Sequence, residues 1–292
     1  MTRPCPGPDY ETRAPKIAPP PKSCDTQAHV FGPVSRFPYA EGRGYTPPDC
    51  PVDLFIRMLD RLGIERGVIV HGSAHGSDNR VTLDGIAQYP DRLRGVAVIA
   101  PDAPDSELET LAEGDIKGLR FSTMLKGAVG TDHLERLAER VRGLGWHLVI
   151  HVDQAREIAE LAPRLRRLGM DVVIDHLGRV RGGQGVNHPA FRALIDLLRT
   201  TDTCWVKLSS WYRLSDQGPP YDDMTPLAEA LIASRPDRVI WGSNWPHPIL
   251  WEGAMPNDGD LLDQFLGWAG DDATRKQILV DNPAVLYGFS DI

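Results

Sequence analysis

Residues 148–176, LVIHVDQAREIAELAPRLRRLGMDVVIDH, place two kinds of hydrophobic pattern next to each other. Leu148–Val152 and Val172–Ile174 are short, nearly continuous apolar runs, which are typical of strands buried on both faces. Between them, apolar residues recur every three or four positions over Arg156–Leu168, as on one face of a helix. The stretch therefore predicts a strand, a helix and a second strand, the unit from which parallel sheets are built.

The same alternation recurs along the chain. The apolar runs that predict strands are Cys24–Phe31, Gly67–Val70, Gly95–Ala100, Gly118–Phe121, Leu148–Val152, Val172–Ile174, Trp205–Leu208 and Val239–Trp241. Helical spacing is found over Asp53–Leu62, Asp132–Leu144, Arg156–Leu168, Phe191–Leu198, Met224–Ala233 and Leu261–Trp268. Eight such strands in 292 residues predict an α/β fold, the (β/α)₈ TIM barrel. An open doubly wound sheet is the alternative, but the first strand is followed by no glycine-rich phosphate loop.

The N-terminal residues differ from the rest of the chain because proline is frequent in them. Residues 4–22 read PCPGPDYETRAPKIAPPPK. Proline lacks the amide hydrogen and has a fixed φ, so this composition predicts neither a helix nor the interior of a strand. We expect residues 1–22 to form an extended arm and residues 23–292 to form a single barrel domain.

The composition limits the classes of function. The chain is 41% hydrophobic and 25% charged, which is ordinary for a globular protein. Its net charge of −8 argues against general binding to nucleic acid or to an anionic membrane. The four cysteines match no zinc or redox motif, and no signal peptide is evident. We expect a cytoplasmic protein with free thiols that acts on a small molecule; a homo-oligomer is compatible with the sequence.

Polar side chains follow several of the predicted strands. In a TIM barrel, functional residues lie at the carboxyl ends of the strands and in the loops after them. Four of the nine histidines, His29, His71, His151 and His176, fall at such positions. Packing alone does not account well for several histidines at the ends of different strands, so we expect a functional cluster. Other polar candidates there are Gln27, Ser73, Arg120, Lys126, Arg213, Asn244 and His247.

Four motifs give the chain a family resemblance. They are CDTQAHVFG at 24–32, RFPY at 36–39, DHLG at 175–178 and WGSNWPHP at 241–248. With these motifs, the chain from about residue 23 to residue 289 resembles the amidohydrolase superfamily, in the branch of 2-pyrone-4,6-dicarboxylate hydrolase and D-galactarolactone isomerase. The resemblance implies an amidohydrolase-like TIM barrel and an enzyme that acts on a carboxylated lactone.

Two departures from the family pattern bear on a metal. The family has His-x-His at the first strand and an aspartate at the eighth, where this chain has Gln27 and Asn244. A neutral amide binds zinc poorly and cannot act as a base near neutral pH. We therefore expect no metal cofactor. The alternative is one zinc ion held by His29, His151 and His176.

The resemblance also implies how a substrate is held. Arg120 and Arg213 match positions that bind substrate carboxylates, and Lys126 stands where an arginine is expected. Tyr45 and Ser73 match pocket-lining positions, and we place His247 with this substrate-binding group. For His75 and Lys207 we expect a structural role.

The expected chemistry starts at a lactone carbonyl. His29, His176 and His151, together with Gln27 and Asn244, are the expected catalytic group. Without the aspartate, water lacks a base, whereas a hydroxyl of the bound substrate has a high effective concentration. We therefore favour intramolecular lactone isomerisation. The alternatives are a lactone hydrolase like 2-pyrone-4,6-dicarboxylate hydrolase, or a non-hydrolytic barrel that is a decarboxylase, a cyclase or a binding protein.

Overall fold

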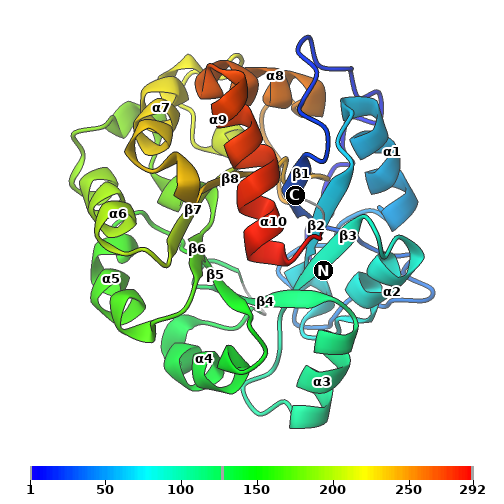
Figure 1. Cartoon of the computed structure of the whole chain (residues 1–292). Coiled ribbons are helices and arrows are strands. Elements are labelled where there is room, and N and C mark those ends of the chain that lie inside the picture. The colour runs from blue at the N-terminus through cyan, green and yellow to red at the C-terminus, as the bar shows by residue number, and fades with distance from the viewer. Residues whose placement is uncertain (1, 126–127, 291–292) are drawn as a thin grey trace.

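Eight parallel strands form the wall of a barrel in the computed structural model, which describes residues 2–125 and 128–290 (Figure 1). Each strand pairs with the next in sequence order from β1 to β8. The predicted TIM barrel is confirmed, and the predicted strands differ from the observed ones by a few residues at their ends. The strands are β1 (Cys24–Ala28), β2 (Arg66–Val70), β3 (Leu93–Ala97), β4 (Ile116–Ser122), β5 (His147–His151), β6 (Val172–Ile174), β7 (Cys204–Leu208) and β8 (Val239–Trp241).

Helices surround this wall (Figure 1). The glycine after the helix of the opening stretch, Gly169, has φ of 60°, a left-handed conformation that ends the helix before β6. The helices are α1 (Val52–Leu62), α2 (Arg80–Gln88), α3 (Asp105–Glu113), α4 (Leu134–Arg142), α5 (Glu157–Leu168), α6 (Pro189–Thr200), α7 (Thr225–Ser234), α8 (Asp258–Ala269), α9 (Asp272–Lys276) and α10 (Asn282–Tyr287). Among the described residues, none of these helices has the length and apolar character needed to cross a membrane.

One end of the barrel is closed by α10, which crosses it in Figure 1. Leu286, Tyr287 and Phe289 are buried in one hydrophobic cluster with interior residues of the strands, such as Val68 and Trp205. Burial of this apolar surface stabilises the end of the barrel where the strands begin. The strands finish at the opposite end of the barrel, and the polar candidate side chains lie at that end.

The barrel closes between β1 and the segment that follows β8. The Asn244 N–H donates to the Gln27 carbonyl at 2.7 Å, and the His29 N–H donates to the Trp245 carbonyl at 2.7 Å. Gly242 permits this approach, since a Cβ there would lie 2.4 Å from the Cβ of Gln27. The backbone of the GSN motif is therefore fixed against the ends of β1, and Asn244 is held beside His29.

Residues 2–22 form neither helix nor strand. They begin at the loops at the carboxyl end of the barrel and run to the opposite end, where the Lys22 N–H donates to Glu65 Oε1 at 2.9 Å just before β2. The Cys5 N–H donates to the Thr46 carbonyl at 2.7 Å, and the Trp251 ring N–H donates to the Pro4 carbonyl at 2.9 Å. Further along, the Arg13 N–H donates to the Asn257 side chain at 3.0 Å. This segment thus ties the loop after β1 to the loop after β8.

Candidate active site

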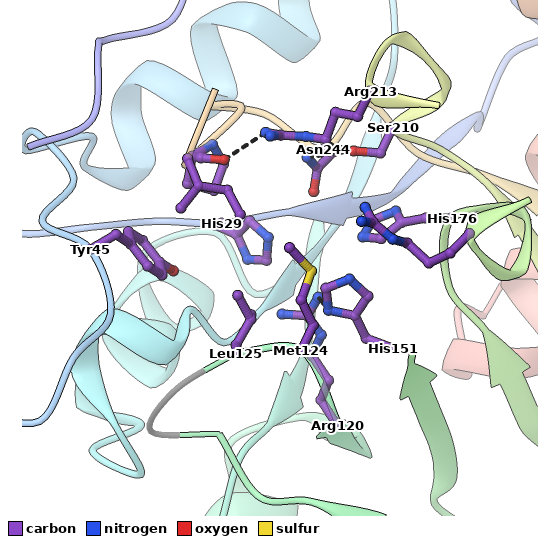
Figure 2. A pocket seen from close by; sticks show the side chains of 13 residues that line it. His29, Tyr45, Arg120, Met124, Leu125, His151, His176, Ser210, Arg213 and Asn244 are labelled. Atoms are coloured by element: carbon purple, nitrogen blue, oxygen red, sulfur yellow. Dashed lines mark hydrogen bonds between the residues drawn. The ribbon is translucent and has the colours of Figure 1, made fainter. Parts of the chain in front are cut away.

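A pocket opens at the carboxyl end of the barrel (Figure 2). Seven of the residues expected from the sequence line it: His29, Tyr45, Arg120, His151, His176, Arg213 and Asn244. Gln27, Ser73 and His247 are buried but do not line it, and Lys126 lies outside the described residues. The remaining lining residues, which the sequence analysis did not select, are Met124, Leu125, Arg179, Ser210, Pro248 and Ile249.

Strand geometry explains how β4, β5 and β6 deliver their side chains. Arg120 and Ser122 lie two residues apart on β4 and therefore face the same side. Ser122 is paired with His151 at the end of β5. His176 directly follows the strand residues of β6 and Asp175, and its φ of 53° starts a left-handed turn that continues to Arg179, with φ of 63°. The turn brings both His176 and Arg179 to the pocket.

The three pocket histidines are uncharged. Burial, reinforced by the positive charge of Arg120, lowers the pKa of His29 to about 3. Burial and Arg120 likewise hold the pKa values of His151 and His176 well below the usual range. Figure 2 shows the three imidazoles around a common space, into which Arg120 reaches from below. The histidines can thus orient and polarise a ligand, but His29 is a weak base near neutral pH.

Hydrogen bonds assign the tautomers of two of these rings. His29 Nδ1 lies 2.6 Å from the carbonyl of Val70, so Nδ1 carries the proton and Nε2 keeps a lone pair. Arg120 Nη2 donates to His151 Nδ1 at 3.2 Å, so the His151 proton is on Nε2. His29 therefore offers an acceptor and His151 offers a donor. His176 Nδ1 lies 2.7 Å from the Ser209 hydroxyl, which admits either tautomer.

A fully buried charge cluster lies under the pocket. Lys207 Nζ is 3.1 Å from Asp175 Oδ1 and donates to Gln27 Oε1 at 2.7 Å. Arg120 Nε is 3.4 Å from Asp175 Oδ2. Burial would raise the pKa of Asp175, but the charges of Lys207 and Arg120 outweigh it and lower that pKa. Lys207, expected to be structural, is thus the cation that holds Gln27 and Asp175 in place beneath the histidines.

These residues do not fit a metal ion. Within residues 2–125 and 128–290, no group of three or more His, Cys, Asp or Glu side chains could hold one. The donor chemistry gives the reason, because the oxygen of Gln27 already accepts from the Lys207 ammonium and His151 Nδ1 accepts from Arg120. Arg120 and Lys207 thus place positive charge next to the pocket histidines, and like charges repel a metal cation.

The β7 and β8 side of the pocket contains a hydrogen-bonded amide. Asn244 has φ of 65°, and its Nδ2 donates to Ser210 Oγ and to Tyr212 Oη, each at 2.9 Å. Both amide hydrogens are used, so Oδ1 remains as an acceptor. His247 lies one layer further back, where its Nδ1 is 2.8 Å from Tyr212 Oη and its Nε2 is 3.2 Å from Asp258 Oδ1. The expected substrate contact of His247 is therefore indirect in this geometry.

Positive charge dominates the pocket lining. Arg120, Arg179 and Arg213 line it, and no Asp or Glu is found among the lining residues that the structure describes. Arg120 is balanced by Asp175, whereas neither Arg179 nor Arg213 has a carboxylate within 4.0 Å in the described chain. Sequence reasoning missed Arg179, although it follows the DHLG motif directly. Such an arrangement fits an anionic ligand through charge-assisted hydrogen bonds.

The lining also includes one phenol and several apolar side chains. Tyr45 lines the pocket, and the Ser73 hydroxyl lies behind it, 3.5 Å from the Tyr45 oxygen. Met124 and Leu125 follow β4, and Ile249 follows β8. The Ile249 N–H donates to Cys5 of the N-terminal segment at 3.2 Å, which supports this part of the lining from outside. The pocket lining thus combines cationic and apolar side chains.

Comparison with known proteins agrees with this geometry. The model of the amidohydrolase family matches residues 24–289. The chain is 40% identical over 288 residues to 4-sulfomuconolactone hydrolase of Hydrogenophaga intermedia, covering 97% of this chain and 94% of the relative. It is 31% identical over 283 residues to D-galactarolactone isomerase of Agrobacterium fabrum, covering 96% and 95%.

A solved structure shows the same architecture. It is a probable 2-pyrone-4,6-dicarboxylic acid hydrolase of Acinetobacter baumannii with citric acid bound, 30% identical, with a TM-score of 0.79. The match covers 92% of this chain and 100% of that one. The chain therefore belongs to the amidohydrolase family, in the branch that contains 2-pyrone-4,6-dicarboxylate hydrolase and D-galactarolactone isomerase.

Proposed function

We propose that this protein is a lactone isomerase that works without a metal and transfers the acyl group of an anionic lactone to a hydroxyl of the same substrate. The observation that carries the proposal is the bonding of Asn244. Its two amide hydrogens are directed to Ser210 and Tyr212, so its oxygen can hold a hydroxyl but cannot remove a proton. A hydroxyl that already belongs to the bound substrate gains the most from such positioning.

The cations of the pocket define the substrate class. Arg179 and Arg213 lack a carboxylate partner in the described chain and point to a ligand that carries at least one carboxylate, with Arg120 nearby. The names of the relatives support this, since they act on a sulfonated lactone and on a pyrone dicarboxylate. The related structure with bound citric acid supports a polycarboxylate as well. The proposed substrate is a lactone with a carboxylate and a free hydroxyl.

The neutral histidines supply polarisation. His151 offers an Nε2 proton to the carbonyl oxygen of the lactone, where negative charge develops as the hydroxyl adds. His29 offers its Nε2 lone pair as an acceptor that holds the hydroxyl before it attacks. The ring C–O bond then breaks, and the released alkoxide takes up the proton that the attacking hydroxyl gave up. No water is consumed in this sequence.

Turnover of a lactone panel tests the proposal. Pairs of five- and six-membered lactones of the same hydroxylated dicarboxylic acid are incubated with the enzyme and followed by proton NMR. The proposal predicts interconversion of the two ring sizes before open-chain acid accumulates. Lactones without a carboxylate are the matched substrate control and should react slowly. Absence of any turnover on this panel would leave a binding barrel as the better description.

Hydrolysis is the second candidate, and the relatives favour it. Two 4-sulfomuconolactone hydrolases are 40% and 41% identical to this chain over nearly the whole length. A hydrolase of this type would give open-chain acid as the first product, with no transient second lactone. The NMR time course therefore separates the two candidates in one experiment.

A further inference from the structure

A chain of polar contacts, which ends in a buried ion pair, leads from the pocket to the start of α8. Ser210 and Asn244 line the pocket, and both contact Tyr212 Oη, at 3.4 Å and 2.9 Å. Tyr212 Oη lies 2.8 Å from His247 Nδ1, and His247 Nε2 lies 3.2 Å from Asp258 Oδ1. The side chains of His247 and Asp258 are fully buried. The chain thus links a pocket hydroxyl to a buried carboxylate through one phenol and one imidazole.

The direction of these bonds singles out the phenol oxygen. Asn244 Nδ2 can only donate to Tyr212, and the Ser210 hydroxyl donates to the same oxygen. His247 donates as well when the buried Asp258 carboxylate keeps it protonated. A neutral phenol must donate its own proton to an acceptor. The three groups around Tyr212 Oη all act as donors, so no good acceptor is left for that proton. The site around Tyr212 therefore suits a phenolate.

We infer that Tyr212 takes up, through Ser210, the proton of the attacking hydroxyl, and so replaces the carboxylate that Asn244 lacks. Ser210 Oγ accepts from Asn244 Nδ2 and, at 3.2 Å, from Arg213 Nε. In this step Arg213 turns to the substrate carboxylate and frees an acceptor site on Ser210. The substrate hydroxyl then passes its proton to Ser210 Oγ while the Ser210 proton moves to the Tyr212 oxygen. The new C–O bond forms at the carbonyl, and the two protons return when the ring oxygen leaves. Because Tyr212 acts through Ser210, it is a positioning residue, and this inference rests on the proposed lactone chemistry.

The charges around Tyr212 support the inference. Burial would raise its pKa, but Arg213 and His247 outweigh burial and lower that pKa to about 8. Burial would lower the pKa of His247, but Tyr212 and Asp258 raise it to about 9. The Arg213 guanidinium carbon lies 5.2 Å from the centre of the Tyr212 ring. Tyr221 also interacts electrostatically with Tyr212, and Asp9 of the N-terminal segment interacts electrostatically with His247.

The tyrosine inventory makes a direct test available. The chain has seven tyrosines, and the pKa values of the other six are raised: Tyr10, Tyr39, Tyr45, Tyr89, Tyr221 and Tyr287. A spectrophotometric titration without substrate should therefore show a single tyrosine that ionises near pH 8. Tyr212→Phe should remove this transition, and Tyr89→Phe, at the surface, should keep it. Asp258→Asn should move it to higher pH, because His247 loses its counter-charge.

The pH dependence of turnover tests the use of this group. In the wild type, kcat/KM should rise about tenfold per pH unit up to about pH 8 and then level off, because the phenolate is the active form. In Tyr212→Phe, kcat/KM should fall by about 10²–10⁴-fold, and its rise with pH should disappear. An unchanged rise of kcat/KM with pH in Tyr212→Phe, or the absence of a tyrosine that ionises near pH 8 in the wild type, would overturn the inference. Failure of the wild type to act on any lactone would instead refute the proposed function, with the titration result still standing by itself.

Discussion

Removal of the buried cation Lys207 should destabilise the fold strongly. Its ammonium is fully buried, 3.1 Å from Asp175 Oδ1, where an effective dielectric constant of about 20 gives an attraction of about 5 kcal/mol. In Lys207→Met, Asp175 keeps Arg120 at 3.4 Å, and Gln27 Oε1 loses its donor. Breaking a buried pair from one side typically costs about 3–5 kcal/mol. We expect a loss of this size in the free energy of unfolding.

A matched control is available on β4. Lys117 Nζ lies 2.9 Å from Asp115 Oδ1, but both side chains are partly exposed. Lys117→Met should therefore change the free energy of unfolding by at most about 1 kcal/mol. Urea denaturation of the wild type and the two variants at neutral pH measures both values. Equal losses in Lys207→Met and Lys117→Met would refute the view that the cluster is a buried ion network on which the pocket floor depends.

Three substitutions and one chelator treatment test the pocket. Arg179→Met and Arg213→Met should each weaken the binding of a tricarboxylate such as citrate by about 1.5–3 kcal/mol, measured by calorimetry, and unchanged affinity in both would show that these cations do not hold the ligand. Asn244→Asp should raise lactone hydrolysis by about 10²–10⁴-fold relative to isomerisation, and equal product ratios in variant and wild type would place the base elsewhere. Prolonged dialysis against a chelator should leave turnover unchanged, whereas recovery of lost activity with zinc would contradict the metal-free proposal.

Hydrophobic patterns were sufficient to predict the fold class, because the spacing of apolar residues differs between strands and helices and both spacings occur in the sequence. The stretch around β5, α5 and β6 has both signals, and its elements lie within a few residues of prediction. The helical spacing did not predict four helices, which are α2 (Arg80–Gln88), α3 (Asp105–Glu113), α9 (Asp272–Lys276) and α10 (Asn282–Tyr287). α3 buries only Leu108 and Leu111, which is too few apolar positions to establish a period.

The site was predictable as far as strand ends determine it. The rule that functional residues follow barrel strands brought His29, His151 and His176 to one pocket, but it also selected His71, which does not line that pocket. It could not tell which side chains face the pocket and which lie behind it, since both kinds occur in the same motifs. Asn244 lines the pocket while His247, three residues later, is buried behind Tyr212. Whether a side chain lines the pocket or lies behind it depends on tertiary contacts.

The role of Lys207 shows a second limit. A lysine inside a strand of apolar residues gives no sequence signal for its partners, which come from β1 and from the loop after β6. Its position became meaningful once closure of the barrel brought Gln27 and Asp175 to it. The replacement of a family histidine by Gln27 could be noticed in the sequence, but the contact of its side-chain oxygen with the buried Lys207 ammonium required the structure.

The source of the acceptor oxygen tests the central claim most directly. The reaction is run in water enriched in oxygen-18, and the product is analysed by mass spectrometry at low conversion. If the acyl group passes to a hydroxyl of the same substrate, the isomeric lactone carries no label. Incorporation of one oxygen-18 atom into the first product would show that water attacks the carbonyl, and would contradict intramolecular transfer.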